Sequence, residues 1–396
     1  MCHTSIDRIT INRDYLITTL TDLVRIDSTN PLCMPGGAGE AQIAAYIAGA
    51  LDALGFRADM HEIQPGRVNV VGTLPGTGNG RSLLLHAHTD TVGVIGMDDP
   101  FSAHIDRGRL YGRGAQDIKS GMAAILAAVK ALVDAGIVPG GDVIVAGAAD
   151  EEYTSIGTEA LVKQLDASGT AVDGAIVTEP TGLALGLAHR CFTWYEVETI
   201  GRAAHGSRYD LGIDANMRMG RFLAKLDILE QALRARDPHP LVGPPSLHAA
   251  LLQGGTEPSI YADRCELRIE RRTLPGETEA QTTAELQAIV DALSVQDATF
   301  RANVKPLLQR LPFEIDAGAP IVKTVDRAAA RQLDQPAVYV GLPFWTDAAL
   351  IAAAGVETVV IGPAGQGLHQ PEEWVDIQSV VDLAHILAES IVCYCA

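Results

Sequence analysis

The chain has 396 residues and a formal net charge of −19, with 47% hydrophobic and 20% charged residues. These proportions are those of a folded globular protein, and this length predicts two domains. The acidity argues against nucleic acid as a partner, because phosphate binding needs a basic patch and no Lys/Arg cluster is visible.

No stretch approaches the roughly 20 apolar residues that span a bilayer, so no membrane partner is expected. The N-terminal segment lacks a positively charged leader followed by an apolar run. The expected location is therefore cytoplasmic.

The six cysteines are dispersed along the chain, and without a secretory leader they are expected to be free thiols. Cys393 and Cys395 form a C-x-C segment near the end of the chain. Two thiolates at this spacing could oxidise or bind a metal, but a metal site would need further ligands nearby. An ordinary helix end is the preferred interpretation.

The first half of the chain alternates between predicted helices and strands. Apolar residues recur at helical spacing in the early segments, and short apolar runs typical of buried strands follow. The predicted helices cover 15–25, 40–55 and 118–136, and the predicted strands cover 67–74, 82–88, 142–149 and 174–180. This alternation predicts an α/β domain with a mostly parallel sheet and helices on both faces.

Around Gly186 the pattern changes to strand, helix, strand, strand, helix, strand. The predicted strands cover 193–201, 246–255, 262–274 and 298–308, and the predicted helices cover 216–235 and 278–294. This order is typical of a ferredoxin-like α+β unit that folds as a small domain. We therefore expect an inserted domain at 187–309, within a larger domain formed by 1–186 and 310–396.

Carboxylates and histidines stand where several apolar runs of the larger domain end. They are His88, Asp90, Asp117, Glu151, Glu152, Glu179 and His369. In an open α/β sheet the carboxyl ends of the strands open onto one crevice, so residues far apart in sequence can meet there. The sequence therefore predicts a metal centre in the domain formed by 1–186 and 310–396.

The segment HAHTD places His86, His88 and Asp90 on one face of a strand, because strand side chains alternate with period two. We interpret His88 as a metal ligand and Asp90 as the carboxylate that orients it. His86 is interpreted as a core histidine with a satisfied hydrogen bond. A His-x-His pair also serves as a metal pair in barrel amidohydrolases, so this segment alone leaves that alternative open.

The remaining carboxylates also have structural alternatives. The adjacent Glu151 and Glu152 are typical of a solvated helix start, although at a strand end they can divide the roles of ligand and base. Asp117 follows a Gly-rich turn and precedes a helix, where it could be a ligand or an N-cap. Glu179 ends a buried run, where a charge is costly unless it is paired or metal-bound.

Taken together, these motifs resemble a known family. The segments are GRLYGRGAQDIKSGMAA, the H-x-D, the Glu-Glu pair, the Glu-Pro, GRAAHGS and ERRTLPGE. They resemble the M20 dinuclear zinc amidohydrolases and peptidases, which include acetylornithine deacetylase, succinyl-diaminopimelate desuccinylase, aminoacylase and glutamate carboxypeptidase. The resemblance runs in order from about Leu16 to the C-terminal helix. It implies a zinc-peptidase-like catalytic domain, with 187–309 as a lid through which a homodimer forms.

The resemblance also implies a ligand set for two Zn²⁺ ions. His88, Asp117 and Glu179 resemble the ligands of one ion. Asp117, Glu152 and His369 resemble those of the other, so that Asp117 bridges the two. A mixed histidine and carboxylate shell suits Zn²⁺, and Co²⁺ or Mn²⁺ could substitute.

Further residues take their implied roles from the same resemblance. Glu151 resembles the general base, and Asp90 belongs to the implied catalytic set. His205, in GRAAHGS, resembles the histidine that polarises the substrate carbonyl, and it comes from the neighbouring subunit in dimeric members. Arg272 matches a substrate-binding arginine, whose planar charge suits a carboxylate. Thr346, in FWTDAAL, resembles the loop that faces the substrate pocket.

The implied activity is hydrolysis of the amide bond of an N-acyl amino acid by a metal-bridged hydroxide. A dipeptidase or carboxypeptidase would use the same site on a peptide bond, and a protein that binds without turnover would keep the fold alone. The bulky Phe344 and Trp345 are explained by a more apolar pocket or, more simply, by core packing.

Overall fold

The computed structural model describes residues 6–396 and divides the chain into two compact units. The first unit runs up to Leu187 and continues in Ile315–Val340 and Thr346–Ala396. The second unit is formed by Ala188–Glu314 and Gly341–Trp345. The predicted insertion at 187–309 lies close to these bounds, but the short return segment 341–345 had no sequence signal.

The largest sheet is a mixed nine-stranded sheet, most of which lies in the first unit. Its order is β1-β2-β6-β3-β7-β15-β8-β13, with β14 beside β8. The strands are β1 (Arg57–Gln64), β2 (Arg67–Leu74), β3 (Leu83–His88), β6 (Val143–Ala148), β7 (Gly174–Val177), β8 (Leu185–His189), β13 (Phe313–Glu314), β14 (Tyr339–Leu342) and β15 (Glu357–Val360). Parallel pairing is confined to the centre, β6-β3-β7-β15, and the pairs β1-β2, β2-β6, β15-β8 and β8-β13 are antiparallel. The parallel arrangement expected for most of the sheet therefore holds only for its four central strands, because the flanking strands pair antiparallel.

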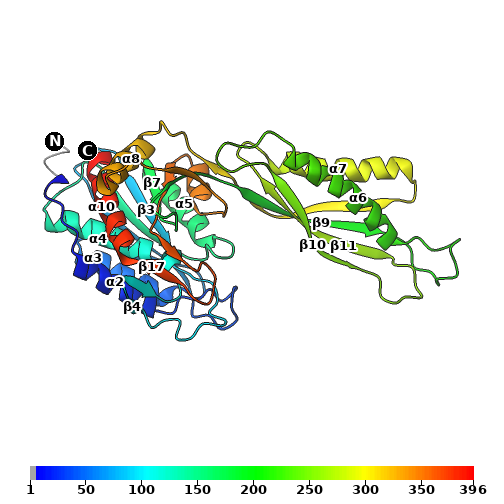
Figure 1. The fold of residues 1–396 in the computed structure, drawn as a ribbon, viewed down its shortest axis with the longest axis horizontal. Helices are drawn as coiled ribbons and strands as arrows, with labels where there is room; N and C mark the ends of the chain where they lie inside the picture. Colours follow the sequence, from blue (N-terminus) through cyan, green and yellow to red (C-terminus); the bar gives the residue numbers. More distant parts are fainter. Residues whose placement is uncertain (1–5) are drawn as a thin grey trace. The chain divides into compact units, whose positions relative to one another are not determined.

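Helices cover this sheet, which confirms the α/β class. They are α2 (Arg13–Arg25), α3 (Ala41–Ala53), α4 (Ser120–Asp134), α5 (Ile156–Ser168), α8 (Pro320–Leu333), α9 (Ala348–Ala353) and α10 (Ile377–Tyr394). The helices α4 and α10 contact each other on one side of β3, and α5, which contacts α9, lies on the other side (Figure 1). Most of α4 is buried because it packs against β3, α2 and α10.

Among residues 6–396, one helix is long and apolar enough to cross a membrane, which the sequence did not lead us to expect. It is α10, with a mean hydropathy of 1.3, and 78% of its length is buried inside the structure. This burial is typical of the core helix of a folded domain, since α10 packs against α4 and α8.

A small antiparallel sheet completes the first unit. Its order is β16-β17-β5-β4, from strands β4 (His104–Asp106), β5 (Arg109–Tyr111), β16 (Gly365–Gln366) and β17 (Trp374–Asp376). The sheet ties the segment before Asp117 to the segment after His369, because β5 pairs with β17. Two parts of the chain more than 250 residues apart are thereby held together.

The second unit has the predicted order of strand, helix, strand, strand, helix, strand. Its elements are β9 (Cys191–Ile200), α6 (Ala215–Arg234), β10 (Ser246–Gly254), β11 (Arg264–Thr273), α7 (Glu279–Gln296) and β12 (Arg301–Arg310). The strands form an antiparallel sheet in the order β10-β11-β9-β12. Tyr195, Leu267 and Ile269 pack with Phe222 and Leu286 of the two helices to form its core. The expected ferredoxin-like α+β lid is therefore confirmed as a fold.

The cysteines differ from expectation at one position. Cys33, Cys191, Cys265 and Cys395 are free, but Cys393 is disulfide-bonded, so the expectation of free thiols is wrong for that residue. Cys2 lies outside the described residues. Within the described residues, neither cysteine of the C-x-C belongs to a group that could hold a metal ion.

Candidate metal centre

Three neighbouring strands bring the predicted residues to one edge of the sheet. In the parallel register, His88 at the end of β3 lies opposite Ala148 at the end of β6, and His86 lies opposite Val177 at the end of β7. Glu179 therefore follows β7 at the level of His88, and Glu151 comes three residues after Ala148, just beyond the end of β6. This register is the physical reason why residues distant in sequence converge.

Two groups of side chains have ligand atoms within 4.8 Å of one another. One consists of His88, Asp117 and Glu179, and the other of Asp117, Glu152 and His369. Asp117 belongs to both: its Oδ1 lies 3.1 Å from Nε2 of His88, and its Oδ2 lies 3.4 Å from Nε2 of His369. Nε2 of His369 also lies 3.1 Å from Oε2 of Glu152. One carboxylate thus faces both groups with different oxygens.

Asp117 does not cap a helix, so that alternative is wrong. It lies in a short helical turn, η1 (Ala115–Lys119), and α4 begins three residues later with Lys119 as its N-cap. The preceding Gly114 has a φ of 81°, and an added Cβ would come within 2.8 Å of Thr91. The Gly-rich approach therefore allows the close backbone packing that aims Asp117 at the histidines.

Burial of the carboxylates is the largest influence on the electrostatics of the site, and repulsion among them adds to it. Burial, reinforced by Glu179, raises the pKa of Glu151 well above its usual value. Burial likewise raises the pKa of Glu152 and Glu179, with Asp117 adding to both shifts. One oxygen of Glu179 is buried without a hydrogen-bond partner. A cation would relieve these costs.

The pKa values of His88 and His369 are raised, so both rings favour the protonated form, and a bound metal would displace these protons. Hydrogen bonds to Asp117 and Glu152 raise the pKa of His369 to about 10. Burial opposes the charged form of His88, but hydrogen bonds to Asp117 and Asp90 raise its pKa well above the usual value. Nδ1 of His88 donates to the Asp90 carbonyl oxygen at 3.0 Å, which leaves Nε2 as the atom that faces Asp117.

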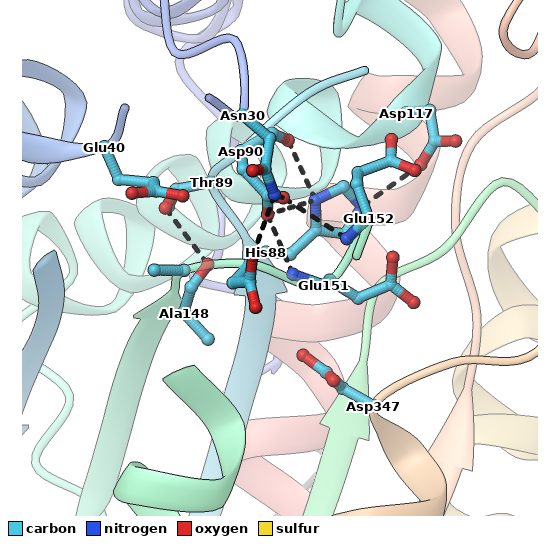
Figure 2. Close-up of polar contacts among 12 residues, drawn as sticks. Asn30, Glu40, His88, Thr89, Asp90, Asp117, Ala148, Glu151, Glu152 and Asp347 are labelled. Carbon is cyan, nitrogen blue, oxygen red and sulfur yellow. Dashed lines mark hydrogen bonds and ion pairs between the residues drawn. The ribbon is translucent and has the colours of Figure 1, made fainter. Parts of the chain in front are cut away.

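Asp90 contacts His88 through two of its groups. Its carbonyl oxygen accepts from Nδ1 at 3.0 Å, and its carboxylate oxygen Oδ1 lies 3.5 Å from the same nitrogen. Its carboxylate accepts hydrogen bonds from the backbone N–H groups of Glu151 and Glu152 at 3.0 and 3.2 Å (Figure 2). Asp90 therefore fixes both His88 and the turn that carries Glu151 and Glu152 (the glutamate turn).

Several buried polar residues around the site had no sequence signal. Glu373 accepts backbone hydrogen bonds from Gly114, Gln116 and Asp117, and it pairs with Arg113 at 2.6 Å. It thus anchors the Asp117 loop beside the His369 segment. Asn30, Glu40, Arg67 and Asp150 form a second buried network behind the glutamate turn.

His86 lies outside both ligand groups. Its Nε2 lies 2.8 Å from the hydroxyl of Thr158, which donates to Asp347 at 2.7 Å. Burial, with His88 adding to it, lowers the pKa of His86 to about 3, so the ring is neutral. This arrangement fits a buried histidine with one satisfied nitrogen. The open sheet, whose end strands are β1 and β13, also rules out the barrel alternative.

Two of the predicted substrate residues lie in the second unit. His205 is exposed, and its Nδ1 accepts the backbone N–H of Ser207 at 3.2 Å, which leaves the proton on Nε2. Arg272 donates from Nε to Glu270 at 2.6 Å and lies over the ring of Phe192. The neighbouring Arg271 is instead buried.

The segment FWTDAAL is anchored by structural contacts. Thr346 is fully buried, and its hydroxyl accepts the backbone N–H of Ala348 at the start of α9. The indole of Trp345 donates to the Leu311 carbonyl at 3.0 Å, and its ring packs against His189. The bulk of Trp345 is therefore explained by packing.

The donors present fit divalent cations. Imidazole nitrogens and carboxylate oxygens are ligands of zinc, cobalt and manganese, and a carboxylate shared between two groups is suited to a pair of ions. The unpartnered oxygen of Glu179 is a buried acceptor that a cation would satisfy. Metal binding is therefore the chemistry for which the site is built.

Comparison with known proteins agrees with this geometry. Residues 84–392 match the sequence model of peptidase family M20/M25/M40. The chain is 30% identical to N-formyl-4-amino-5-aminomethyl-2-methylpyrimidine deformylase of Bacillus subtilis, over 89% of each chain. It is 28% identical to acetylornithine deacetylase of Myxococcus xanthus, over 95% of this chain and 97% of that one.

Solved structures share the fold at lower identity. Aminopeptidase PepT of Bacillus cereus matches with a TM-score of 0.78 and 20% identity, over 96% of this chain and 98% of that one. A dinuclear metal-binding peptidase of the M20 family from Bacillus subtilis matches with a TM-score of 0.75 and 16% identity, over 97% and 98%.

Proposed function

Because this chain belongs to peptidase family M20/M25/M40, we propose that it is a metal-dependent hydrolase that cleaves the amide bond of an N-acyl amino acid. The observation that carries the proposal is Asp117, which two ligand groups share. The deformylase and deacetylase names of its relatives support an acyl amide as the substrate. A dipeptidase or carboxypeptidase is the alternative, and it has less support because the peptidases of similar structure share only the fold.

In the proposed site, His88, Asp117 and Glu179 hold one cation, and Asp117, Glu152 and His369 hold the other. We propose Zn²⁺ as the native metal, with Co²⁺ or Mn²⁺ as substitutes. When bound, the two ions supply an acidified water and polarise the scissile carbonyl.

Glu151 is the proposed general base. It takes a proton from the attacking water and delivers it to the leaving amine. Asp90 holds the backbone of Glu151 in place during these transfers. His205, with its proton on Nε2, is proposed to donate to the carbonyl oxygen as negative charge develops there. Arg272 is proposed to bind the substrate carboxylate, and the substrate role of Thr346 stays a prediction.

The proposal is tested on the purified protein by metal analysis and by the release of free amine. The substrates are N-formyl, N-acetyl, N-succinyl and longer N-acyl amino acids, with dipeptides as the comparison. We expect two ions per chain, turnover of acyl substrates that is lost on chelation, and recovery with Zn²⁺ or Co²⁺. Faster turnover of dipeptides would favour the alternative, and turnover that survives complete metal removal would refute both.

We also propose that the chain forms a homodimer through its second unit and acts in the cytoplasm. The supporting feature is β10, an edge strand that exposes 69% of Leu251 and 57% of Leu252. Exposed apolar edges are places where another chain can pair. Leu251→Lys should shift the mass in solution from dimer to monomer, and a wild-type monomer would contradict the proposal. Cell fractionation tests the location.

A further inference from the structure

A buried polar network reaches from β2 to the turn that carries Glu151 and Glu152. The side chain of Arg67 is 4% exposed, and those of Glu40 and Asp150 are fully buried. Arg67 binds Glu40 through Nε and Nη2 at 2.8 and 2.6 Å. The same Nη2 donates to Oδ1 of Asp150 at 2.8 Å. One guanidinium therefore offsets two buried carboxylates.

Asn30 links this ion network to the centre. Its amide nitrogen donates to Oδ2 of Asp90 at 2.8 Å and to Oδ1 of Asp150 at 3.0 Å. Its amide oxygen accepts the backbone N–H of Leu32 at 3.0 Å, so the whole amide is satisfied. Figure 2 shows Asn30 above Asp90, and Glu151 and Glu152 to the lower right of Asp90. The side chain of Asn30 thus joins Asp90 and Asp150, the two carboxylates that hold the glutamate turn.

The turn itself is held by these carboxylates. Oδ2 of Asp150 accepts the backbone N–H of Thr154 at 3.2 Å, while Asp90 accepts those of Glu151 and Glu152. Asp150 has a φ of 70°, in the left-handed region, where a non-glycine residue needs such support. The positions of Glu151 and Glu152 therefore depend on where Asp150 is held.

We propose that Arg67 is a positioning residue that sets the metal affinity of the group Asp117, Glu152 and His369. It acts through Asp150, which it binds directly, and its hydrogen bonds go to Glu40 and Asp150 rather than to a ligand or to Glu151. The inference rests on the proposed metal-dependent function. Glu152 of this group lies on the turn that Asp150 holds, whereas His88 of the other group is connected to Arg67 only indirectly, through Asp150, Asn30 and Asp90, so the loss of affinity should fall on the group that contains Glu152.

Arg67→Met tests the proposal because it removes the guanidinium and keeps an unbranched, mostly apolar stem. The full chain is stripped of metal and titrated with Zn²⁺ in a competition assay. We expect one ion to bind as in the wild type and the other about 10- to 100-fold more weakly, as is typical when a residue supporting a ligand is lost. Arg67→Lys keeps the charge but not the fork of donors, so its affinity for the weakened ion should lie between those of the wild type and Arg67→Met. It also replaces Arg67→Met in the test if that variant does not fold.

Arg271→Met is the matched control, since it removes an equally buried arginine from the second unit. It should bind both ions as the wild type does. Equal weakening at both sites, or the same loss in the control, would mark general destabilisation and overturn the proposal.

Hydrogen exchange of residues 150–156 in the metal-free protein gives a readout that needs no metal. We expect faster exchange in both Arg67 variants and no change in the control. Unchanged exchange in both variants would also overturn the positioning role. If the wild type bound no metal, the proposed function would fail, while this exchange would still decide whether Arg67 holds the turn.

Discussion

Two buried ionisable side chains, one in each unit, differ in whether neighbouring residues satisfy them. In the second unit, the side chain of Arg271 is 1% exposed, and its guanidinium binds Glu277 and Glu285 at 2.8 and 3.2 Å. In the first unit, Glu179 is 4% exposed, and one of its carboxylate oxygens has no hydrogen-bond partner. A compensated buried charge maintains a fold, whereas an uncompensated one destabilises it unless a ligand is bound. Unmatched charge, rather than burial, therefore distinguishes the functional unit.

The largest expected effect comes from Asp117→Ala, which removes the carboxylate shared by both ligand groups. Because each of its oxygens faces a different histidine, the variant should bind neither ion tightly and should lose all measurable turnover. Metal analysis after dialysis checks the first point. Normal loading with two ions would contradict the shared role and with it the contrast between the units.

Glu151→Gln should separate chemistry from metal binding. The residue belongs to neither ligand group, so two ions should remain, while kcat should fall by about 10²- to 10⁴-fold because the general base is lost. Steady-state kinetics and metal analysis on the same preparation test this. Near-normal kcat would exclude Glu151 as the base.

Arg271→Met should affect stability and leave metal binding unchanged, because it breaks a compensated ion pair in the second unit. It removes the more buried of the two arginines that Glu277 and Glu285 share, the other being Arg236, and the lost charged hydrogen bonds should lower the free energy of unfolding by about 2 kcal/mol. Denaturant unfolding measures the loss, and metal content should not change. A variant as stable as the wild type would show that the buried pair contributes nothing.

The smallest effect is a graded dependence of metal binding on pH. In the metal-free protein, Asp117 and Glu152 raise the pKa of His369 to about 10, so at neutral pH a cation must displace a proton. Apparent affinity should therefore rise with pH, by about tenfold per unit for each proton displaced. Chelator competition at several pH values measures the slope, and His369→Gln should reduce it by one proton. A flat profile would show that His369 gives up no proton to the metal.

The fold was most predictable where the apolar pattern was strong. The bounds expected for the strand 67–74 agree with β2, and those expected for the helix 216–235 lie within one residue of α6, because both segments have clear apolar patterns. In contrast, β1 was missed, since it is a mostly exposed edge strand with the polar sequence RADMHEIQ. The strand β8 was missed because it is short, contains Gly186 and Ala188, and runs into the first residues of the second unit.

Local sequence predicted the site where residues stand at strand ends, and the family resemblance was needed to assign Asp117 and His369, which lie between strands. His88, Glu152 and Glu179 follow apolar runs, so local sequence placed them at the edge of the sheet. Asn30 and Arg67 could not be found this way, because their roles arise from contacts with residues 60 and 83 positions away. Isolated polar side chains in a sequence give no sign of the partners that will surround them.

The strand pairing at the junction of the two units has a practical consequence. Ala188 and Glu314 are antiparallel partners on β8 and β13, as are His189 and Phe313, so the chain departs and returns on adjacent strands. A two-residue hairpin turn could therefore join His189 to Phe313 in place of the residues between them. Such a shortened protein would be a scaffold into which other domains with neighbouring termini could be grafted.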